Sequence, residues 1–300
     1  MLTFLPVLIR LPLALLLVAL NVLVHASVLL MLAVIKALVP IAGFRAWISR
    51  ALVAIAEQWI AVNGILFALI TRTRWRVDGL EGLDRRGWYL VLSNHQSWVD
   101  IPVLQNTFNR RIPFLKFFLK QKLKWVPVLG LAWWALDFPF MQRYTKHQLE
   151  AHPQWRGKDK QATRAACEKF RHAPVSVMNF VEGTRYTAAN HAQQQSPFAN
   201  LLRPRAGGVA FVLEAMGDMF HSIVDVTIVY PGGTPTMIDL LANRIPEIRV
   251  HVRQLPIPQQ FIGGDYENDA EFRERFQNWI NALWMEKDAL IKAMRGIEQT

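Results

Sequence analysis

The 300 residues of this chain suffice for one large domain or two small ones, and 52% of them are hydrophobic, more than a soluble domain usually carries. The single cysteine, Cys167, excludes an intramolecular disulfide framework and suits the reducing cytoplasm. The formal net charge of +11 at pH 7 implies an anionic partner, and nucleic acid, an anionic bilayer and a phosphorylated substrate all qualify.

The beginning of the chain, residues 1–72, predicts a membrane anchor. No charged residue occurs from Leu11 to Ile35, and a helix of this length spans about 37 Å, enough to cross a bilayer core of about 30 Å. One cation, Arg10, precedes this stretch, and the cations that follow it are Lys36, Arg45, Arg50, Arg72, Arg74 and Arg76. Because the more cationic flank of a span stays in the cytoplasm, we expect the rest of the chain to face the cytoplasm from the cell inner membrane.

Two alternatives bear on this anchor. A signal peptide cleaved after Ala26 is disfavoured, because the apolar stretch continues past that residue and the charge bias is wrong for export. A second apolar stretch, at about residues 51–70, is broken by Glu57, Gln58, Asn63 and Gly64. We expect it to form an interfacial or re-entrant helix, and a second full span is the alternative.

Strand-like and helix-like runs alternate in residues 73–300. The strand candidates are 88–93, 175–180, 224–230 and 248–252, with a weaker one near 75–77, and the helical stretches between them are 163–171 and 207–216. The alternation predicts one α/β domain with a mixed, largely parallel sheet flanked by helices. Residues 271–297 predict an amphipathic helix that docks on this domain, and 187–197 and 231–235 predict exposed loops.

The most informative polar residues follow the strand candidate 88–93, in the sequence Asn-His-Gln-Ser-Trp-Val-Asp of residues 94–100. Open α/β sheets place their ligands at the carboxyl ends of strands. His95, oriented by Asp100, can accept a proton from a hydroxyl and turn that oxygen into a nucleophile. Five residues turn about 500° on an ideal helix, so the two side chains can meet only in a loop or in a loop that enters a helix. For this pair taken alone, a structural histidine with a fortuitous aspartate is the alternative.

The stretch from Arg110 to Trp125 interleaves six cations with large apolar side chains. It predicts an interfacial segment, with its apolar groups at the headgroup boundary and its lysines on the phosphates of anionic membrane lipids. An amphipathic core helix is the alternative. Nucleic-acid binders also mix basic and aromatic residues, but no nucleic-acid motif is present, so we do not expect nucleic acid as a partner.

A second polar cluster, Glu182-Gly183-Thr184-Arg185, follows the strand candidate 175–180. It is therefore also expected at the carboxyl end of a strand. The glycine permits a close backbone approach, and the guanidinium of Arg185 offers a planar charged fork for a phosphate monoester. Glu182 is expected to pair with Arg185 or to bind a substrate hydroxyl, and a turn with a structural Glu–Arg pair is the alternative.

Together the two motifs resemble those of the PlsC-like glycerolipid acyltransferases, the 1-acylglycerol-3-phosphate O-acyltransferase family. The first family motif, N-H-x-x-x-x-D, is matched by Asn94, His95 and Asp100. The third, F-x-E-G-T-R, is matched by Phe180, Glu182, Gly183, Thr184 and Arg185. The resemblance covers roughly residues 75–258, and the runs at 136–141, 157–159 and 167–171 look most like the bacterial YihG-type branch.

Other family features are matched less closely. Residues 140–143 resemble the second motif without its usual lead-in glycine, which implies a phosphate contact for Arg143. Lys120 resembles the lysine found between the first two motifs. The fourth motif normally centres on an apolar–Pro pair, and Val229-Tyr230-Pro231 is a loose match. This departure bears on acyl-chain and acceptor selectivity more than on the chemistry.

The resemblance implies acyl transfer from acyl-CoA or acyl carrier protein to the hydroxyl of lysophosphatidic acid, giving phosphatidic acid. His95 would act as the general base, and Asp100 would hold its tautomer. The residues implied in acceptor binding are Glu182, Gly183, Thr184, Arg185, Lys120 and Arg143. Ser97 is not expected to be a nucleophile, because a thioester is already activated.

The sequence predicts neither a metal nor a redox cofactor, because it has no cluster with metal-ligand spacing and no glycine-rich nucleotide loop. Three other functions remain open at this point. They are transfer to another lysophospholipid, hydrolysis of acyl thioesters or esters, and a catalytically silent, membrane-anchored binding or regulatory role.

Overall fold

The protein folds around a six-stranded sheet, seen in a computed structural model that describes residues 2–141, 158–171 and 173–296. The strands lie in the order β1-β8-β7-β2-β6-β3. Their bounds are Arg74–Asp78 (β1), Tyr89–Ser93 (β2), Leu115–Phe117 (β3), Ser176–Phe180 (β6), Ser222–Val229 (β7) and Glu247–Leu255 (β8). Only the β7–β8 pair is antiparallel among these neighbours. The predicted mixed, largely parallel α/β sheet is confirmed.

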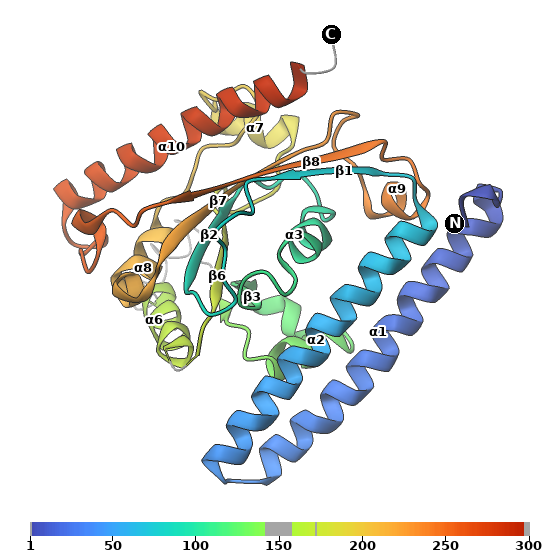
Figure 1. The fold of residues 1–300 in the computed structure, drawn as a ribbon. Coiled ribbons are helices and arrows are strands. Elements are labelled where there is room, and N and C mark those ends of the chain that lie inside the picture. Colours follow the sequence, from blue (N-terminus) through green and yellow to red (C-terminus); the bar gives the residue numbers. More distant parts are fainter. Residues whose placement is uncertain (1, 142–157, 172, 297–300) are drawn as a thin grey trace.

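Helices cover both faces of this sheet (Figure 1). Side chains alternate along the central strand β2, so Tyr89 and Val91 belong to one apolar cluster and Leu90 and Leu92 to the other. The first cluster includes residues of α1 (Val7–Leu38), α2 (Ala42–Ile70), α3 (Asp100–Phe108) and α4 (Leu129–Ala135). The second includes residues of α6 (Lys158–Phe170), α8 (Gly207–Met216) and α10 (Ala270–Gly296).

The C-terminal helix α10 is amphipathic, as predicted. Its buried residues include Phe272, Phe276, Ile280 and Leu283, whose spacing of three or four residues places them on one face. Ile297, at the end of the predicted helix, lies outside the described residues. The helix therefore closes the second face of the sheet with a continuous apolar stripe.

The helix α10 also buries an ammonium group against the sheet. Lys287 is fully buried, and its Nζ lies 2.7 Å from Oδ1 of Asp225 and donates to the carbonyl of Val226 at 2.7 Å. Arg253 donates to the other oxygen of Asp225 at 2.8 Å. Burial lowers the pKa of Lys287, and the aspartate opposes that effect. These partners compensate for the loss of water around the buried charge.

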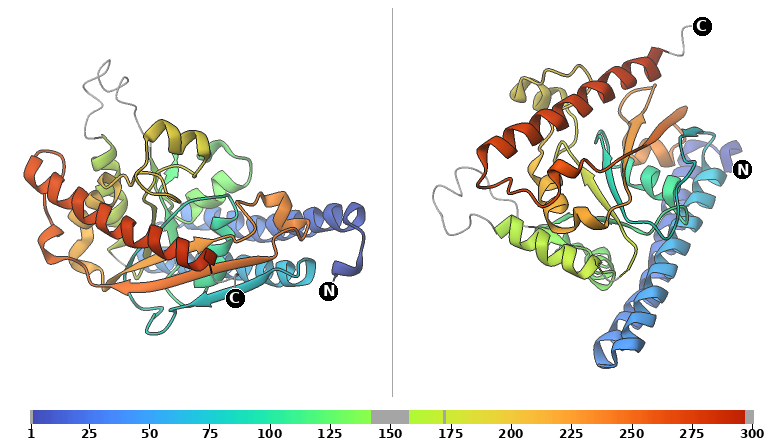
Figure 2. Two further views of the ribbon diagram at one scale, coloured as in Figure 1. Left: turned by 90° about the horizontal axis from the view of Figure 1, so that it is seen from above. Right: turned by 60° about the vertical axis from the view of Figure 1, so that its left-hand side comes forward.

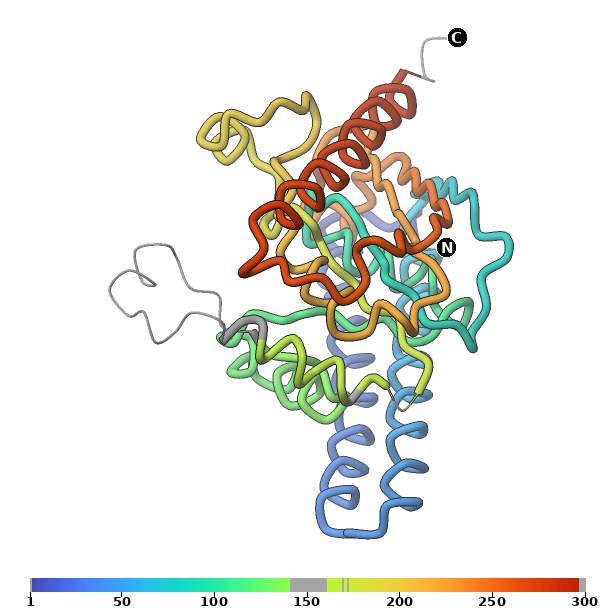
Figure 3. The backbone as a smooth tube through the Cα atoms, turned by 90° about the vertical axis from the view of Figure 1, so that its left-hand side faces the viewer, coloured from blue at the N-terminus to red at the C-terminus, as the bar shows by residue number. Residues whose placement is uncertain are grey.

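The helices α1 and α2 form an antiparallel hairpin whose turn projects beyond the sheet (Figures 2 and 3). Both helices are long and apolar enough to cross a membrane, judged by length and composition. Inside the hairpin, the amide of Asn21 donates to the side chain of Asn63 at 2.8 Å and to the carbonyl of Trp59 at 3.2 Å. Paired amides of this kind fix the register of two apolar helices.

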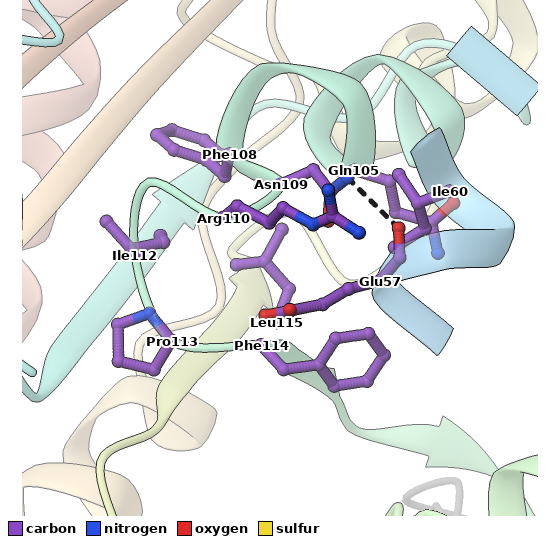
Figure 4. Close-up of a pocket in the computed structure, with 10 residues that line it drawn as sticks. All are labelled: Glu57, Ile60, Gln105, Phe108, Asn109, Arg110, Ile112, Pro113, Phe114 and Leu115. Atoms are coloured by element: carbon purple, nitrogen blue, oxygen red, sulfur yellow. Dashed lines mark hydrogen bonds between the residues drawn. The ribbon is translucent and has the colours of Figure 1, made fainter. Parts of the chain in front are cut away.

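The hairpin also packs on the sheet domain through polar contacts. Arg10 donates to the carbonyl of Ala242 at 2.8 Å, and Arg85 donates to the carboxylate of Glu57 at 2.8 Å. A small crevice between α2 and the end of α3 shows a third contact, in which the amide of Asn109 donates to the carbonyl of Glu57 at 3.1 Å (Figure 4). The crevice is lined by none of the predicted site residues.

The shorter elements are η1 (Leu2–Phe4), β4 (Leu119–Lys120), η2 (Gln121–Trp125), β5 (Phe140–Met141), α7 (Ala188–Gln194), η4 (Gly217–Met219), α9 (Met237–Leu241) and η5 (Gln259–Phe261). One prediction fails here. Residues 187–197 were expected as a loop, but Thr187 accepts a hydrogen bond from the Asn190 amide and begins α7. Within residues 110–125, Leu115 and Phe117 are buried in β3 and Gln121–Trp125 forms the short helix η2, so the alternative of one amphipathic core helix is wrong, and the interfacial segment stays a prediction.

Candidate active site

The two sequence motifs meet because their strands are parallel neighbours. Ser93 at the end of β2 pairs with Phe180 at the end of β6. The residues that follow, 94–100 and 181–185, therefore leave the sheet at the same edge. A backbone hydrogen bond from the Tyr186 amide to the His95 carbonyl, 2.7 Å long, joins the two segments directly.

The structure brings His95 and Asp100 together as a hydrogen-bonded pair. Nδ1 of His95 lies 2.8 Å from Oδ2 of Asp100, and the imidazole stacks on Phe180 with the ring centroids 3.9 Å apart. Asp100 is the first residue of α3, so the chain passes from a loop into a helix between the two residues. When Nδ1–H donates to the carboxylate, Nε2 is left as a proton acceptor. The pair therefore has the arrangement of a general base and its orienting acid.

Four donors hold the carboxylate of Asp100 in place. Besides His95, Oδ2 accepts from the backbone amides of Gln96 at 2.6 Å and Ser97 at 2.9 Å. Oδ1 accepts from the hydroxyl of Tyr230 at 2.6 Å. Both oxygens of the buried carboxylate are thus engaged, which fixes its orientation toward the imidazole.

Glu182 supports the backbone of the His95 loop. Its Oε1 accepts from the His95 amide at 3.0 Å, and its Oε2 accepts from the Leu202 amide at 2.9 Å. The side chain is fully buried, and this burial raises the pKa of Glu182 to about 8, although the hydrogen bonds from the two backbone amides act to lower it. The expected pair with Arg185 is absent between these two described residues, because Glu182 faces the interior and Arg185 the surface.

Gly183 and Thr184 form the turn that separates these two side chains. Gly183 has φ of +70°, in the left-handed region that favours glycine, and its amide donates to the Phe180 carbonyl at 2.9 Å. Arg185 emerges from the turn with its guanidinium 5.0 Å from the centre of the Trp98 ring, a cation–π contact. Thr184 and Arg185 both line an open groove at the surface.

This groove adjoins an apolar cavity. The groove is lined by polar residues that include Ser97, Thr184, Arg185 and Thr236. The cavity, of about 340 Å³, lies between α1, α2, α3 and α4 and is lined by residues that include Val22, Leu29, Phe67, Ile101 and Trp133. Trp98 and Met237 line both spaces. A molecule with a charged head and an apolar tail can therefore place each part in a matching environment at this edge.

The remaining predicted ligands of the acceptor lie apart from the groove or outside the described residues. Lys120 is exposed in β4, just beyond β3, and does not line the groove. Because β3 runs parallel to β6, Lys120 follows the same edge of the sheet as Phe180. Arg143 lies outside the described residues. Among residues 2–141, 158–171 and 173–296, no three His, Cys, Asp or Glu side chains are grouped as metal ligands would be.

Neighbouring side chains fix the His95 loop through contacts with β7 and the loop after it. The side-chain amide of Asn94 exchanges two hydrogen bonds of 2.9 Å with the backbone of Ile228. The hydroxyl of Ser97 donates to the Pro235 carbonyl at 2.5 Å. Tyr230 is a partner of Asp100 that was not expected, and its signals in the sequence were its place at the end of the strand candidate 224–230 and its match to the fourth family motif.

Fold and site together define an α/β protein with a hydrogen-bonded His–Asp pair at the carboxyl edge of its sheet, an arrangement suited to taking a proton from a hydroxyl. The family model described as Acyltransferase matches residues 74–231, a little over half of the chain. The chain therefore belongs to the acyltransferase family. The matched region runs from β1 to the residue after Tyr230, so it contains both motifs and the strands that carry them.

Curated proteins with similar sequences bear related names. The 1-acyl-sn-glycerol-3-phosphate acyltransferase epsilon of Mus musculus is 25% identical over 67% of this chain and 56% of its own length. The delta protein of Macaca fascicularis is 23% identical over 81% of this chain and 60% of its own length. The probable 1-acyl-sn-glycerol-3-phosphate acyltransferase 5 of Arabidopsis thaliana is 26% identical over 67% of this chain and 54% of its own length. The chain thus spans a little over half the length of these relatives.

Among solved structures, the 1-acyl-sn-glycerophosphate (LPA) acyltransferase PlsC from Thermotoga maritima matches with a TM-score of 0.48 and 16% sequence identity. The match covers 89% of this chain and 95% of that one.

Proposed function

We propose that this chain transfers a fatty acyl group from a thioester to the free hydroxyl of lysophosphatidic acid, giving phosphatidic acid. The observation that carries the proposal is the His95–Asp100 pair, 2.8 Å apart, beside the groove that Arg185 lines. The names of the relatives from Mus musculus and Arabidopsis thaliana support the same acceptor class. Within the family, the YihG-type branch stays a prediction carried by residues 136–141, 157–159 and 167–171.

In this reaction Nε2 of His95 takes the proton of the acceptor hydroxyl as its oxygen attacks the thioester carbonyl. A C–O ester bond forms and the C–S bond breaks, and the proton on the imidazole passes to the departing thiolate. Asp100 stabilises the imidazolium that forms in between. No acyl-enzyme is required, and the engaged hydroxyl of Ser97 agrees with this reaction scheme.

The groove and the cavity suit the two parts of the substrates. Arg185 and Thr184 line the groove, where a guanidinium fork can hold the acceptor phosphate. The apolar cavity between the hairpin and the sheet domain suits an acyl chain, and Trp98 and Met237 lie where the two spaces meet. Lys120 and Arg143 remain predicted phosphate contacts. The acyl donor is acyl-CoA or acyl carrier protein, as a co-substrate, with no resident cofactor.

The chain acts at a membrane surface, with α1 and α2 inserted and the sheet domain facing the cytoplasm at the cell inner membrane. The hairpin exposes many apolar side chains, and α4, which packs beside α1, extends this surface with Leu131 and Trp134. The lysines of η2, Lys122 and Lys124, lie just before α4 and suit anionic lipid phosphates. A lipid acceptor can then reach the site without leaving the membrane.

The test is acyl transfer by the full chain in lipid nanodiscs, with oleoyl-CoA and lysophosphatidic acid as substrates and mass spectrometry of the lipid product. Phosphatidic acid in the wild type, and none above background in His95→Ala, is the expected result. Release of CoA without phosphatidic acid would mean hydrolysis or another acceptor. Failure with several lysophospholipids and with both donor types would overturn the proposal in favour of a binding role.

A further inference from the structure

Tyr230 stands where the resembled family usually has an apolar residue before its fourth-motif proline, and its hydroxyl is placed against the active-site pair. It follows β7 directly, its side chain is 1% exposed, and the hydroxyl donates to Oδ1 of Asp100 at 2.6 Å. Among the described residues, Tyr230 is the one hydrogen-bond donor to Oδ1 of Asp100, whose carboxylate is fully buried. The other oxygen, Oδ2, carries the bonds to His95, Gln96 and Ser97.

We propose that Tyr230 is a positioning residue that sets the basicity of the His95–Asp100 pair through its hydrogen bond to Asp100. This inference rests on the proposed function in that His95 is taken as the base. A charge-assisted hydrogen bond from a phenol withdraws negative charge from the carboxylate. A carboxylate with less charge stabilises the imidazolium less, so His95 gains its proton at a lower pH and stays a competent base over a wider range.

The hydroxyl remains a donor throughout this range. Burial, followed by the charge of Asp100 and the hydrogen bond to it, raises the pKa of Tyr230 well above its ordinary value. The phenol therefore keeps its proton while the imidazole titrates. The ring itself is held in the apolar cluster on the hairpin side of the sheet, so the hydroxyl has a fixed direction.

Other ionisable groups surround the pair, and their effects must be distinguished from that of Tyr230. Glu182, at the end of β6, lies behind the His95 backbone, and Lys287 of α10 interacts electrostatically with it. Lys287 is paired with Asp225 of β7, which also binds Arg253 of β8. On the open side, Arg185 lies over Trp98. All of these groups remain in a Tyr230→Phe variant, so a change in that variant belongs to the hydroxyl.

The experiment compares Tyr230→Phe with Tyr89→Phe in the full chain. Tyr89 is also buried, and its hydroxyl accepts from the Asp84 amide at 2.9 Å at the opposite end of β2. The first readout is the NMR titration of His95 in protein with labelled histidine, which needs no turnover. In Tyr230→Phe the pH at which His95 gains its proton should rise by about one unit, whereas Tyr89→Phe should leave it unchanged.

The second readout is the pH–rate profile of acyl transfer. In Tyr230→Phe the acid limb should move to higher pH by the same amount, so the rate at pH values on that limb falls about tenfold. The rate on the alkaline plateau and the acceptor KM should change by less than about threefold. A merely structural role would lower the rate equally at all pH values. In the Asp100→Asn background, loss of the Tyr230 hydroxyl should have no further effect on the profile.

An unshifted His95 titration in folded Tyr230→Phe would overturn the inference, even if the wild type proved inactive with every substrate. Should Tyr230→Phe not fold, 3-fluorotyrosine at position 230 keeps the bond and strengthens its donor. The His95 titration should then move to lower pH. No shift, or a shift to higher pH, would again contradict the role of Tyr230.

Discussion

At the scale of single residues, the proposed base has two direct tests. His95→Ala removes the imidazole but keeps the backbone bonds of residue 95 to Glu182 and Tyr186. We expect kcat to fall by at least about 10²-fold, the low end for loss of a general base, with vesicle binding unchanged. Asp100→Asn should also lower kcat, with little change in the acceptor KM, because the amide no longer stabilises the imidazolium. Steady-state kinetics in nanodiscs measures both effects.

A second His–Asp pair provides the control for these variants. His251 on β8 is hydrogen-bonded to Asp78 on β1, at the edge of the sheet away from β2 and β6. His251→Ala should leave kcat within about twofold of the wild type, since substitutions far from the active site and the buried core have small effects. Equal activity in His95→Ala and wild type would contradict the proposed mechanism.

Arg185 should act on binding rather than on the chemical step. Arg185→Ala removes the guanidinium from the groove and its contact with Trp98, so the acceptor KM should rise about tenfold or more while kcat changes less. Arg185→Lys should recover only part of this loss, because the ammonium lacks the planar fork. Kinetics at varied acceptor concentration, with Arg203→Ala as a surface control, separates the two parameters. An unchanged KM in Arg185→Ala would place the phosphate elsewhere.

Glu182 should make stability depend on pH. Its pKa is raised from an ordinary value of 4.5 to about 8 by burial, so between these values the folded protein holds a proton that the unfolded chain releases. The stability that this proton brings is complete at pH 4.5 and is lost as pH rises through 8. The Tm of the wild type relative to Glu182→Gln should therefore fall between pH 5 and 8. The Tm of Glu271→Gln, which changes an exposed carboxyl, should follow that of the wild type at every pH. A Tm curve for Glu182→Gln that runs parallel to the wild-type curve from pH 5 to 8 would refute the linkage.

Sequence alone predicts the His95–Asp100 pair but not the residues that hold this pair in place. His95 and Asp100 are five positions apart, and one loop suffices to bring them together. Tyr230 contacts Asp100 across 130 positions, and Glu182 contacts His95 across 87. These contacts depend on the strand order β7-β2-β6, which local patterns do not specify.

At the scale of elements, the turn after β6 places Thr184 and Arg185, the proposed phosphate ligands, and Gly183 allows this turn. Alanine at its φ of +70° costs about 1–2 kcal/mol. Gly183→Ala should therefore lower both Tm and activity. Gly263 has φ of +71° with open space around it, so Gly263→Ala should lower Tm by a similar amount and leave activity unchanged. Thermal unfolding beside kinetics tests this, and equal activity in the two variants would count against the placement.

Some elements are predictable from their side chains and others are not. The central strands β2, β6 and β7 lie within two residues of their predicted bounds, because long apolar and β-branched runs buried on both faces leave a strong signal. The edge strand β3 has only three residues and lies within a lysine-rich segment, so its two buried residues are too few to give a recognisable strand pattern. The helix α7 is short and polar and buries no residue, so it has no apolar stripe, and a capping contact from Thr187 supports its first turn.

At the scale of the whole molecule, the hairpin is part of the folded core as well as a candidate anchor. Leu29, Leu52 and Phe67 of the hairpin belong to the same buried cluster as Leu104 of α3 and Val226 of β7. The apolar cavity lies between the hairpin and α3 and α4, so the hairpin also forms one wall of the proposed acyl site. A division of the chain into residues 1–72 and 73–300 follows the sequence pattern, whereas the packing unites the two parts.

This packing predicts that residues 73–300 do not fold alone. Removal of the hairpin exposes the apolar face of α3 and of the sheet, a patch large enough to drive association. We expect the truncated chain to elute as aggregates and to show no cooperative thermal transition by near-UV circular dichroism. The matched control keeps the hairpin and replaces exposed residues that face away from the cluster, Leu16, Leu20, Leu23 and Val28, by glutamine. That variant should unfold cooperatively yet bind vesicles poorly. If residues 73–300 instead unfold cooperatively as a monomer, the hairpin is a dispensable anchor and the shared core contributes little.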